Sequence, residues 1–315
     1  MATGPRAVVF AYHDVGVRCL LTLLARDIDV ALVVTHRDNP QETIWFGNVH
    51  DTAIEHGIAT VYAEDLDAAA LQVTVEAVAP DFIFSFYFRN MLPAALLSLA
   101  TRGAYNMHGS LLPKYRGRVP INWAIIHGET ETGATLHEMA AKPDAGAIIA
   151  QTVVPILPDD TAREVFVKVV VAAEQTLWRT LPDLIDGVPF RIPNNLTLGS
   201  YFGGRKAEDG RIDWRASAKA IHDLVRAVAP PYPGATTRVD DRRLLIERTR
   251  VLASGSVEYN VPPSSMLVAA RQCLVRCGDG SWLAIRRAAL GGEQLDAAGL
   301  AERLGDGPHR LEGTP

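Results

Sequence analysis

Cysteine is scarce in this chain of 315 residues, which contains three cysteines and nine histidines. Three cysteines are too few for a disulfide framework. Cys273 and Cys277 lie four residues apart in a strand-like segment, and no second pair of cysteines or histidines accompanies them, so they are better interpreted as small core residues than as zinc ligands. The histidines form no HExxH or comparable pair. We therefore expect no metal site.

Long hydrophobic runs are also missing. The best apolar stretch, residues 165–173, is interrupted by Lys168, and it is about half the ~20 residues that a transmembrane helix needs. Residues 1–6 run into a strand-like segment without a charged leader, a long apolar region or a cleavage site. The sequence predicts a cytoplasmic protein that does not insert into a membrane.

Positive charge is not concentrated anywhere in the sequence. Its 31 lysines and arginines against 36 acidic residues give a formal net charge of −5, whereas a surface that binds nucleic acid usually shows as a basic domain or stripe. The densest basic cluster, residues 114–118, is too short for a duplex or a tRNA and suits a small anionic group such as a diphosphate or a glutamate tail. We expect no nucleic-acid partner. Lys114 and Arg116 are candidates for holding a diphosphate, and the alternative is that they are surface charges.

The first half of the chain alternates apolar runs with helical patterns. Apolar runs without polar alternation are typical of parallel strands covered by helices on both faces. The sequence therefore predicts a doubly wound α/β domain with a mainly parallel sheet. The first turn, residues 12–16, lacks GxGxxG, so no nicotinamide cofactor is expected. The predicted strands are 7–11, 30–35, 58–61 and 81–86, and the predicted helices are 17–24, 44–56 and 68–78.

The second half is organised differently. Thr161 and Glu164 form a capping-box signature before the longest helical pattern, 165–181. A stretch rich in glycine, proline and asparagine follows, and beyond it come one helix and several short strands. This part of the sequence predicts a small, mainly β, barrel-like domain. We expect a catalytic domain at 1–190, a linker at 191–204, the β-rich domain at 205–305 and a tail at 306–315.

Three polar residues in the first half of the chain are candidates for a catalytic site. Asn106 and His108 follow a strand-like segment, and residues two apart in an extended chain point to the same side. Asp144 lies in a turn-forming sequence that could bring a carboxylate to the imidazole of His108, and a carboxylate there favours the protonated ring and raises its pKa. An amide donor, an imidazole and a carboxylate would then share one pocket.

The sequence around these residues resembles the signature of the 10-formyltetrahydrofolate-dependent formyltransferase family. The similarity rests on residues 106–120, Asn-Met-His-Gly-Ser-Leu-Leu-Pro-Lys-Tyr-Arg-Gly-Arg-Val-Pro, and it extends through 128–137 and 142–151. This motif is long and specific. The resemblance implies a formyltransferase that uses 10-formyltetrahydrofolate as formyl donor.

Within this family the similarity is greatest to the domain that formylates UDP-4-amino-4-deoxy-L-arabinose in lipid A modification and polymyxin resistance. It covers nearly the whole chain and weakens after about residue 290. It implies a small-molecule nucleotide sugar as substrate, and either a separate dehydrogenase partner or none, because the dehydrogenase domain that accompanies such domains is not in this sequence. The further similar segments are 9–14, 35–40, 84–89, 224–229 and 231–235.

The resemblance also implies roles for individual residues. Asn106 would donate to the oxyanion that develops on the formyl group, His108 would take the proton of the attacking amine, and Asp144 would orient the ring and keep its pKa high. Position 90 is a histidine in the family member with which we compare this chain, and it is an asparagine here. The folate contacts that the resemblance implies are Asn90, Met91, Leu92, Arg118, Ala140, Ala141, Lys142, Pro143 and Asp144.

Three other functions fit the sequence less well. Ser110, with His108 and Asp144, supplies the residue types of a serine hydrolase, but its surroundings are not a GxSxG elbow. A folate-binding module without turnover would require a broken set of catalytic residues, and the set is intact. Methionyl-tRNA formyltransferase, within the family, needs a basic loop after the second strand, and the corresponding segment, 36–47, is short and partly acidic.

Overall fold

Two compact units make up the chain in the computed structural model, which describes residues 4–312. The N-terminal unit takes in the residues up to 120, together with 131–154 and 166–203. The C-terminal unit takes in 121–130, 155–165 and the residues from 204 onward. Two short segments that precede residue 166 therefore belong to the C-terminal unit.

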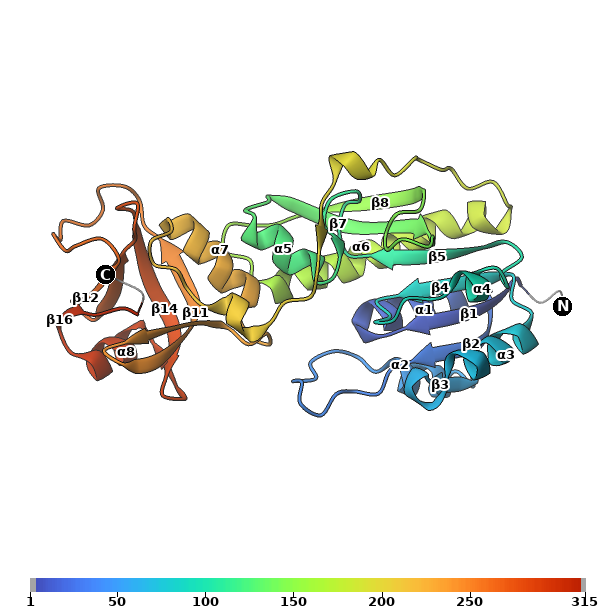
Figure 1. Ribbon diagram of the computed structural model, residues 1–315, viewed down its shortest axis with the longest axis horizontal. Helices are drawn as coiled ribbons and strands as arrows, with labels where there is room; N and C mark the ends of the chain where they lie inside the picture. The colour runs from blue at the N-terminus through green and yellow to red at the C-terminus, as the bar shows by residue number, and fades with distance from the viewer. Residues whose placement is uncertain (1–3, 313–315) are drawn as a thin grey trace. The chain divides into compact units, whose positions relative to one another are not determined.

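The N-terminal unit is built on a seven-stranded sheet with the order β3-β2-β1-β4-β5-β7-β8 (Figure 1). The strands from β3 to β5 in this order pair in parallel, and β7 pairs with β5 in the antiparallel sense. The predicted mainly parallel α/β fold is confirmed. The strands are β1 (Arg6–Ala11), β2 (Asp29–Thr35), β3 (Thr60–Tyr62), β4 (Phe82–Phe86), β5 (Gly103–His108), β7 (Glu131–Glu138) and β8 (Ile148–Pro155).

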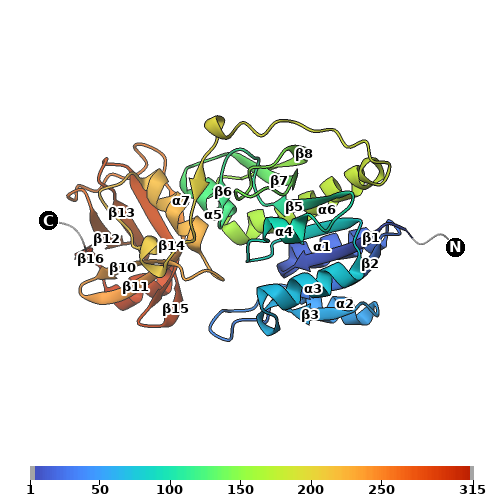
Figure 2. The ribbon, with the colours of Figure 1, turned by 45° about the vertical axis from the view of Figure 1, so that its right-hand side comes forward.

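Helices cover both faces of this sheet, as its apolar strands require. Every residue of β4 is buried, and so are five of the six residues of β1. Since successive side chains point to opposite faces, such runs need cover on both sides. Figure 2 shows α3 and α4 on one face, with α1 and α6 behind the sheet. The helices of this part of the chain are α1 (His13–Leu24), α2 (Val49–Glu55), α3 (Ala68–Val78), α4 (Ala94–Leu97) and α6 (Ala162–Ile185).

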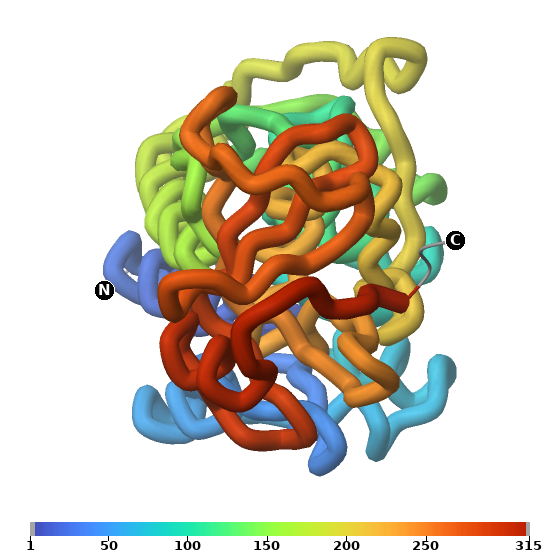
Figure 3. Tube along the Cα trace, turned by 90° about the vertical axis from the view of Figure 1, so that its left-hand side faces the viewer, coloured from blue at the N-terminus to red at the C-terminus, as the bar shows by residue number. Residues whose placement is uncertain are grey.

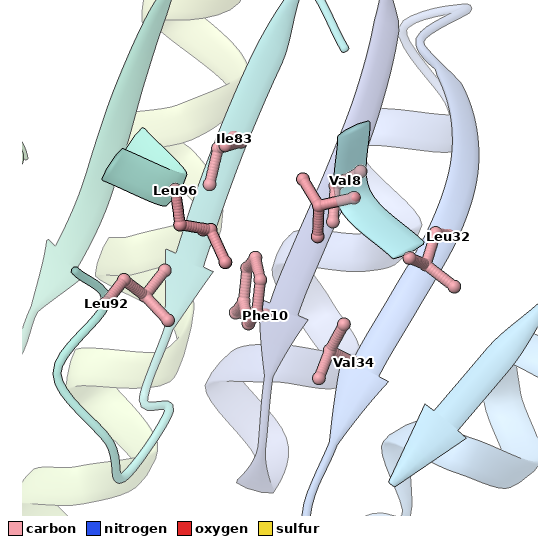
Figure 4. Close-up of a cluster of buried hydrophobic side chains, with 8 residues drawn as sticks. Val8, Phe10, Leu32, Val34, Ile83, Leu92 and Leu96 are labelled. Atoms are coloured by element: carbon pink, nitrogen blue, oxygen red, sulfur yellow. The ribbon is translucent and has the colours of Figure 1, made fainter. Parts of the chain in front are cut away.

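A core of buried aliphatic and aromatic side chains joins the sheet to α3 and α4 (Figure 4). Alternate residues of β1 and β2 supply its sheet side, because residues two apart share a face. Leu96 of α4 and Leu92, just before that helix, pack onto them. The cluster consists of Val8, Phe10, Leu32, Val34, Val75, Ile83, Leu92 and Leu96.

The predicted capping box begins α6. The backbone N–H of Thr161 donates to Glu164 Oε2 at 2.7 Å, and that of Glu164 donates to Thr161 Oγ1 at 3.4 Å. The helix extends beyond the predicted 165–181, because the backbone carbonyl of Pro182 still accepts from Asp186 in the i→i+4 manner. Proline thus stands inside this helix without ending it.

The C-terminal unit contains an antiparallel sheet that curls on itself (Figure 3). Its order is β10-β11-β14-β13-β12-β16, and β15 pairs with β14. The predicted β-rich, barrel-like architecture is confirmed. Its elements are α7 (Ala218–Val228), β10 (Ala235–Val239), β11 (Arg242–Val251), β12 (Ser265–Ala269), β13 (Gln272–Arg276), β14 (Trp282–Leu290), β15 (Glu293–Asp296), α8 (Ala297–Leu304) and β16 (Gly307–His309).

The segments expected to be a linker and a tail make defined contacts. Ile192 pairs with Ile148, and β9 (Tyr201–Phe202) pairs with β6 (Arg116–Gly117). At the other end of the chain β16 pairs with β12, and residues 313–315 lie outside the described part. The pairing of β6 with β9 ties the signature segment to the end of the N-terminal unit.

The three cysteines are free and buried. Cys19 lies on α1, Cys273 lies in β13, and Cys277 follows that strand. Between residues 4 and 312, no group of three or more His, Cys, Asp or Glu side chains could hold a metal ion. In the same range no helix is long and apolar enough to cross a membrane.

Leu96 provides a test of the core. Its side chain is 1% exposed, so Leu96→Ala should remove buried contacts and leave a cavity. We expect the free energy of unfolding, measured by urea titration, to fall by about 2–5 kcal/mol. Val73→Ala is the matched control, because Val73 is on α3 and is 65% exposed. Equal losses in the two variants would contradict this description of the core.

Candidate active site

The signature residues Asn106 and His108 lie at the carboxyl end of β5, the edge of an open α/β sheet at which ligands bind. The antiparallel pairing with β7 places His137 directly opposite Asn106, and Thr135 opposite His108. Directly opposite residues have neighbouring side chains. Asn106 Nδ2 accordingly lies 3.0 Å from His137 Nε2.

Asp144 reaches this edge from the loop between β7 and β8. Its backbone has φ +49°, in the left-handed region that aspartate tolerates better than most residues. Two contacts hold it: Asn194 Nδ2 donates to its carbonyl oxygen at 3.0 Å, and the Gly117 N–H donates to Oδ2 at 2.8 Å. The turn predicted from the sequence thus carries an aspartate whose backbone carbonyl and side-chain carboxylate both accept hydrogen bonds.

The structure brings the three predicted catalytic residues together. Asp144 Oδ1 is 3.5 Å from His108 Nδ1 and 3.4 Å from Asn106 Nδ2. The side chains of His108 and Asp144 are only 7% and 12% exposed, so little water screens them. An amide donor, an imidazole and a carboxylate therefore lie together in one largely buried cluster.

His137 is a member of this cluster that we did not predict. Its Nδ1–H donates to the Glu138 carbonyl at 2.7 Å, so Nε2 is the acceptor for the Asn106 amide. Nε2 also lies 3.4 Å from Asp144 Oδ1. The ring fixes which way the amide of Asn106 points. The signal for it was present in residues 128–137, which end in this histidine, but the strand pairing was needed to place it.

His108 has one nitrogen free for proton transfer. Its Nε2–H donates to the Tyr115 carbonyl at 2.8 Å, so Nδ1, which faces Asp144, is the nitrogen that gains or loses a proton. Burial lowers the pKa of His108 below its ordinary value, and the charge of Asp144 only partly offsets this. The expected high pKa is therefore wrong in its net direction, although Asp144 acts in the expected sense.

The pKa of Asp144 is held below the ordinary range of an aspartate. Burial acts to raise this pKa, and it is outweighed by His108, by His137 and by the N–H of Gly117. Asp144 is therefore ionised at neutral pH. Its contribution to stability is complete above the ordinary pKa of an aspartate and is lost progressively as the pH falls from that value through its lower folded-state pKa.

Ser110 is not placed to act as a nucleophile. Its side chain is fully buried, and its hydroxyl donates to the Lys114 carbonyl at 2.7 Å. Before it comes Gly109, where an added Cβ would lie 2.1 Å from the hydroxyl oxygen of Tyr87. This part of the signature is explained by close packing, which argues against the serine hydrolase.

The expected folate contacts lie in three segments of the N-terminal unit. Arg118 Nη2 donates to the Arg89 carbonyl at 3.4 Å, which places Arg118 beside the segment that follows β4. In that segment Met91 is 58% exposed, whereas Leu92 is part of the hydrophobic core and has only its backbone to offer. The third segment is Ala140, Ala141, Lys142 and Pro143, which lead into Asp144 and are exposed or half-buried.

The two residues expected to bind a diphosphate differ in their surroundings. Arg116 lies in β6, and its Nε is enclosed with no hydrogen-bond partner among the described residues. Lys114 is exposed, one residue before Tyr115. A guanidinium nitrogen without a partner is the stronger sign of a missing ligand, because polar atoms enclosed in protein are nearly always hydrogen-bonded.

His13, just after β1, is surrounded by aromatic rings. It stacks on Phe46 at 3.7 Å between ring centroids, and Trp45 and Phe166 meet it edge-on at 4.8 and 4.5 Å. Its φ of +67° is unusual for a residue other than glycine, and such strain persists only where the surroundings enforce it. The Asp14 N–H donates to His13 Nδ1 at 3.0 Å, so the proton of the neutral ring is on Nε2.

The fold places a cluster of polar side chains at the end of β5, and comparison with known proteins identifies the family. Residues 8–181 match the family described as formyl transferase, and residues 205–304 match the formyl transferase C-terminal domain. The chain therefore belongs to the formyl transferase family and is a formyl-transferring enzyme.

Solved structures of similar fold include two N-formyltransferases. One, from Helicobacter canadensis, was crystallised with folinic acid and dTDP-3-aminofucose, and is 18% identical with a TM-score of 0.69. The alignment covers 93% of this chain and 100% of that one. The other, WlaRD, is a sugar 3N-formyltransferase crystallised with dTDP and 5-N-formyltetrahydrofolate; it is 19% identical with a TM-score of 0.68, and the alignment covers 92% and 98% of the two chains.

HypX from Aquifex aeolicus, in complex with tetrahydrofolic acid, is a third structure of similar fold. It is 18% identical with a TM-score of 0.63. The alignment covers 93% of this chain but 46% of HypX. At these identities the three structures support the fold.

The environment of His13 predicts a pH dependence of stability. Burial, with a smaller contribution from Arg89, lowers the pKa of His13 to about 3. Between the ordinary histidine pKa of about 6.5 and this value, the unfolded chain binds a proton that the folded chain does not, so His13 makes folding less favourable as the pH falls. In His13→Asn, which tolerates the same backbone, that contribution should be absent. Urea titrations at pH 7.5, 6.5 and 5.5 measure the difference, and parallel pH curves for the two proteins would contradict the prediction.

Proposed function

We propose that this enzyme transfers the formyl group of 10-formyltetrahydrofolate to the 4-amino group of a UDP-linked amino sugar, UDP-4-amino-4-deoxy-L-arabinose. The observation that carries formyl transfer is the cluster at β5, in which Asp144 Oδ1 lies 3.5 Å from His108 Nδ1 and 3.4 Å from Asn106 Nδ2. Two formyltransferases that resemble this chain along almost its whole length were crystallised with a sugar nucleotide or its nucleotide part, which supports the sugar substrate.

The roles we propose follow from the geometry. Asn106 Nδ2 donates one N–H to His137 Nε2 at 3.0 Å, and Asp144 Oδ1 lies 3.4 Å from the same nitrogen, which is too long for a strong hydrogen bond with its second N–H. That second N–H is the donor left for the negative charge that develops on the formyl oxygen. A donor of this kind contributes about 3 kcal/mol to the transition state.

His108 acts as the general base in this proposal. Nδ1 accepts the proton of the attacking amine, and Asp144, which is ionised, stabilises the imidazolium that results. The lowered pKa of His108 keeps Nδ1 unprotonated at neutral pH, as a base requires. The same ring then returns the proton to the folate nitrogen that leaves. General acid–base catalysis of this kind is worth roughly 10²–10⁴-fold.

The folate would lie against the segments that surround the cluster. The exposed side chain of Met91 offers an apolar contact, and Arg118 offers a charge for a carboxylate. Arg116, whose Nε has no partner, is our candidate for the diphosphate of the sugar nucleotide, with Lys114 as a second. Asn90, Leu92 and residues 140–144 complete the proposed folate contacts.

The loop after β2 favours a small substrate over a tRNA. Its carboxylates are engaged: Tyr12 Oη donates to Asp38 Oδ1 at 2.7 Å, and Arg89 pairs with Glu42 at 2.8 Å. The loop thus pairs with neighbouring side chains of its own unit, and its carboxylates leave it without the net positive charge that attracts a polyanion.

A panel of acceptors tests the proposed function. We expect formyl transfer from 10-formyltetrahydrofolate to UDP-4-amino-4-deoxy-L-arabinose, weaker transfer to dTDP-linked amino sugars, and none to methionyl-tRNA. Formylated products are measured by mass spectrometry, with an Asn106→Ala variant as the control for enzymatic transfer; its kcat should be about 10²–10³-fold lower. Efficient formylation of the tRNA with every sugar nucleotide inert would overturn the proposal.

The pH dependence of the reaction tests the role of Asp144. The acidic limb of kcat/KM reports the pKa of the base, which must be unprotonated to accept the amine proton. Since Asp144 raises the pKa of His108 against the effect of burial, Asp144→Asn should lower that pKa and move the limb to lower pH. Asp65→Asn, which changes an exposed carboxylate paired with Arg37, should leave the limb in place. An unmoved limb in Asp144→Asn would remove Asp144 from the mechanism.

A further inference from the structure

Arg205, near the start of the last segment of the C-terminal unit, is a half-buried cation. Its Nε is enclosed by protein and has no hydrogen-bond partner in the described part of the chain. Within residues 4–312 its guanidinium makes no hydrogen bond and no ion pair with a carboxylate. Its terminal nitrogens are not enclosed in the same way, so they remain accessible.

The aromatic ring of Trp123 holds this guanidinium. The central carbon of the Arg205 guanidinium lies 5.5 Å from the centroid of the Trp123 ring, within the range of a cation–π contact. Trp123 lies on α5 (Pro120–Ile126), and its neighbour Asn122 is buried and donates to the Ala227 carbonyl at the end of α7, at 2.6 Å. The ring is thus part of a well-anchored element.

The charges around Arg205 do not neutralise it. Asp209 favours the charged form of the guanidinium through space, but its Oδ2 accepts from the Lys206 N–H at 2.7 Å and makes no ion pair with Arg205. Burial outweighs Asp209 and lowers the pKa of Arg205, although a guanidinium stays charged at neutral pH. By contrast, the buried Arg226 of the same unit is paired with Asp223 at 2.8 Å.

We propose that Arg205 and Trp123 form a binding site for a phosphate or diphosphate group. A guanidinium can donate two parallel hydrogen bonds to two oxygens of one phosphate. An aromatic ring packed against the guanidinium fixes the orientation of its plane, and so the direction of these hydrogen bonds. A bound anion supplies the hydrogen-bond acceptors that the protein itself does not give to Arg205. Two sources share this chemistry: free inorganic phosphate or pyrophosphate, and the diphosphate of a sugar nucleotide. The second source rests on the proposed function, in which Arg116 and Lys114 are the other candidates for that diphosphate.

Binding measurements on the full-length protein test the site directly. Inorganic pyrophosphate is titrated calorimetrically into the wild type, Arg205→Gln, Arg205→Lys and Arg215→Gln. We expect binding at least tenfold weaker in Arg205→Gln and an intermediate loss in Arg205→Lys, which keeps the charge but not the planar fork. Arg215→Gln, which changes an exposed arginine paired with Asp213, should bind like the wild type. Equal affinities in all four proteins, each shown to be folded by its melting temperature, would overturn the proposal.

Steady-state kinetics distinguish the two sources. A KM for the sugar nucleotide that rises at least tenfold in Arg205→Gln, with kcat and the KM for the folate preserved, identifies the diphosphate of the substrate. Weaker pyrophosphate binding with an unchanged KM identifies a site for the free anion. Because the calorimetric arm needs no turnover, it decides the proposal even if no amino sugar is formylated and the proposed function fails.

Discussion

The carboxylate of Asp144 is the group on which the arrangement at β5 depends. One of its oxygens accepts from the Gly117 N–H, and the other lies within 3.5 Å of His108, Asn106 and His137. A single buried negative charge therefore organises an amide and two imidazoles that would otherwise have no common partner. Such a charge is stable in the interior only because these groups surround it. The left-handed backbone of Asp144 and the hydrogen bond from Asn194 to its carbonyl oxygen hold the carboxylate in this position.

Much of this arrangement could be predicted from sequence, because the relevant signals are local. The strands of the N-terminal sheet are continuous apolar runs, and Asn106 and His108 share a side because they are two apart in a strand. His137 could not be placed in this way, since its contact with Asn106 arises from pairing across 31 residues. The pKa of His108 was misjudged because a charged neighbour can be read from a motif, whereas the degree of burial depends on the folded environment.

The bounds of the helices and strands were also predicted only in part. The capping box located the start of α6, but the continuation through Pro182 depends on a backbone bond that composition does not reveal. The family resemblance implies a folate contact at Leu92, and the structure puts its side chain in the core beside Leu96. Residues 307–309 have no strong strand signal, yet they pair with β12. In each case tertiary contacts decide what local preference leaves open.

The hydrogen bond from His108 Nε2 to the Tyr115 carbonyl restricts the path of the proton. An imidazole with both nitrogens free can take a proton on one side and release it on the other. In the mechanism proposed above, Nε2 is occupied by this carbonyl, so the proton enters and leaves through Nδ1. The group that gives up the proton and the group that receives it then occupy the same position in turn. In that mechanism a single backbone carbonyl orders the reaction in space, because the attacking and leaving nitrogens exchange places in front of one atom.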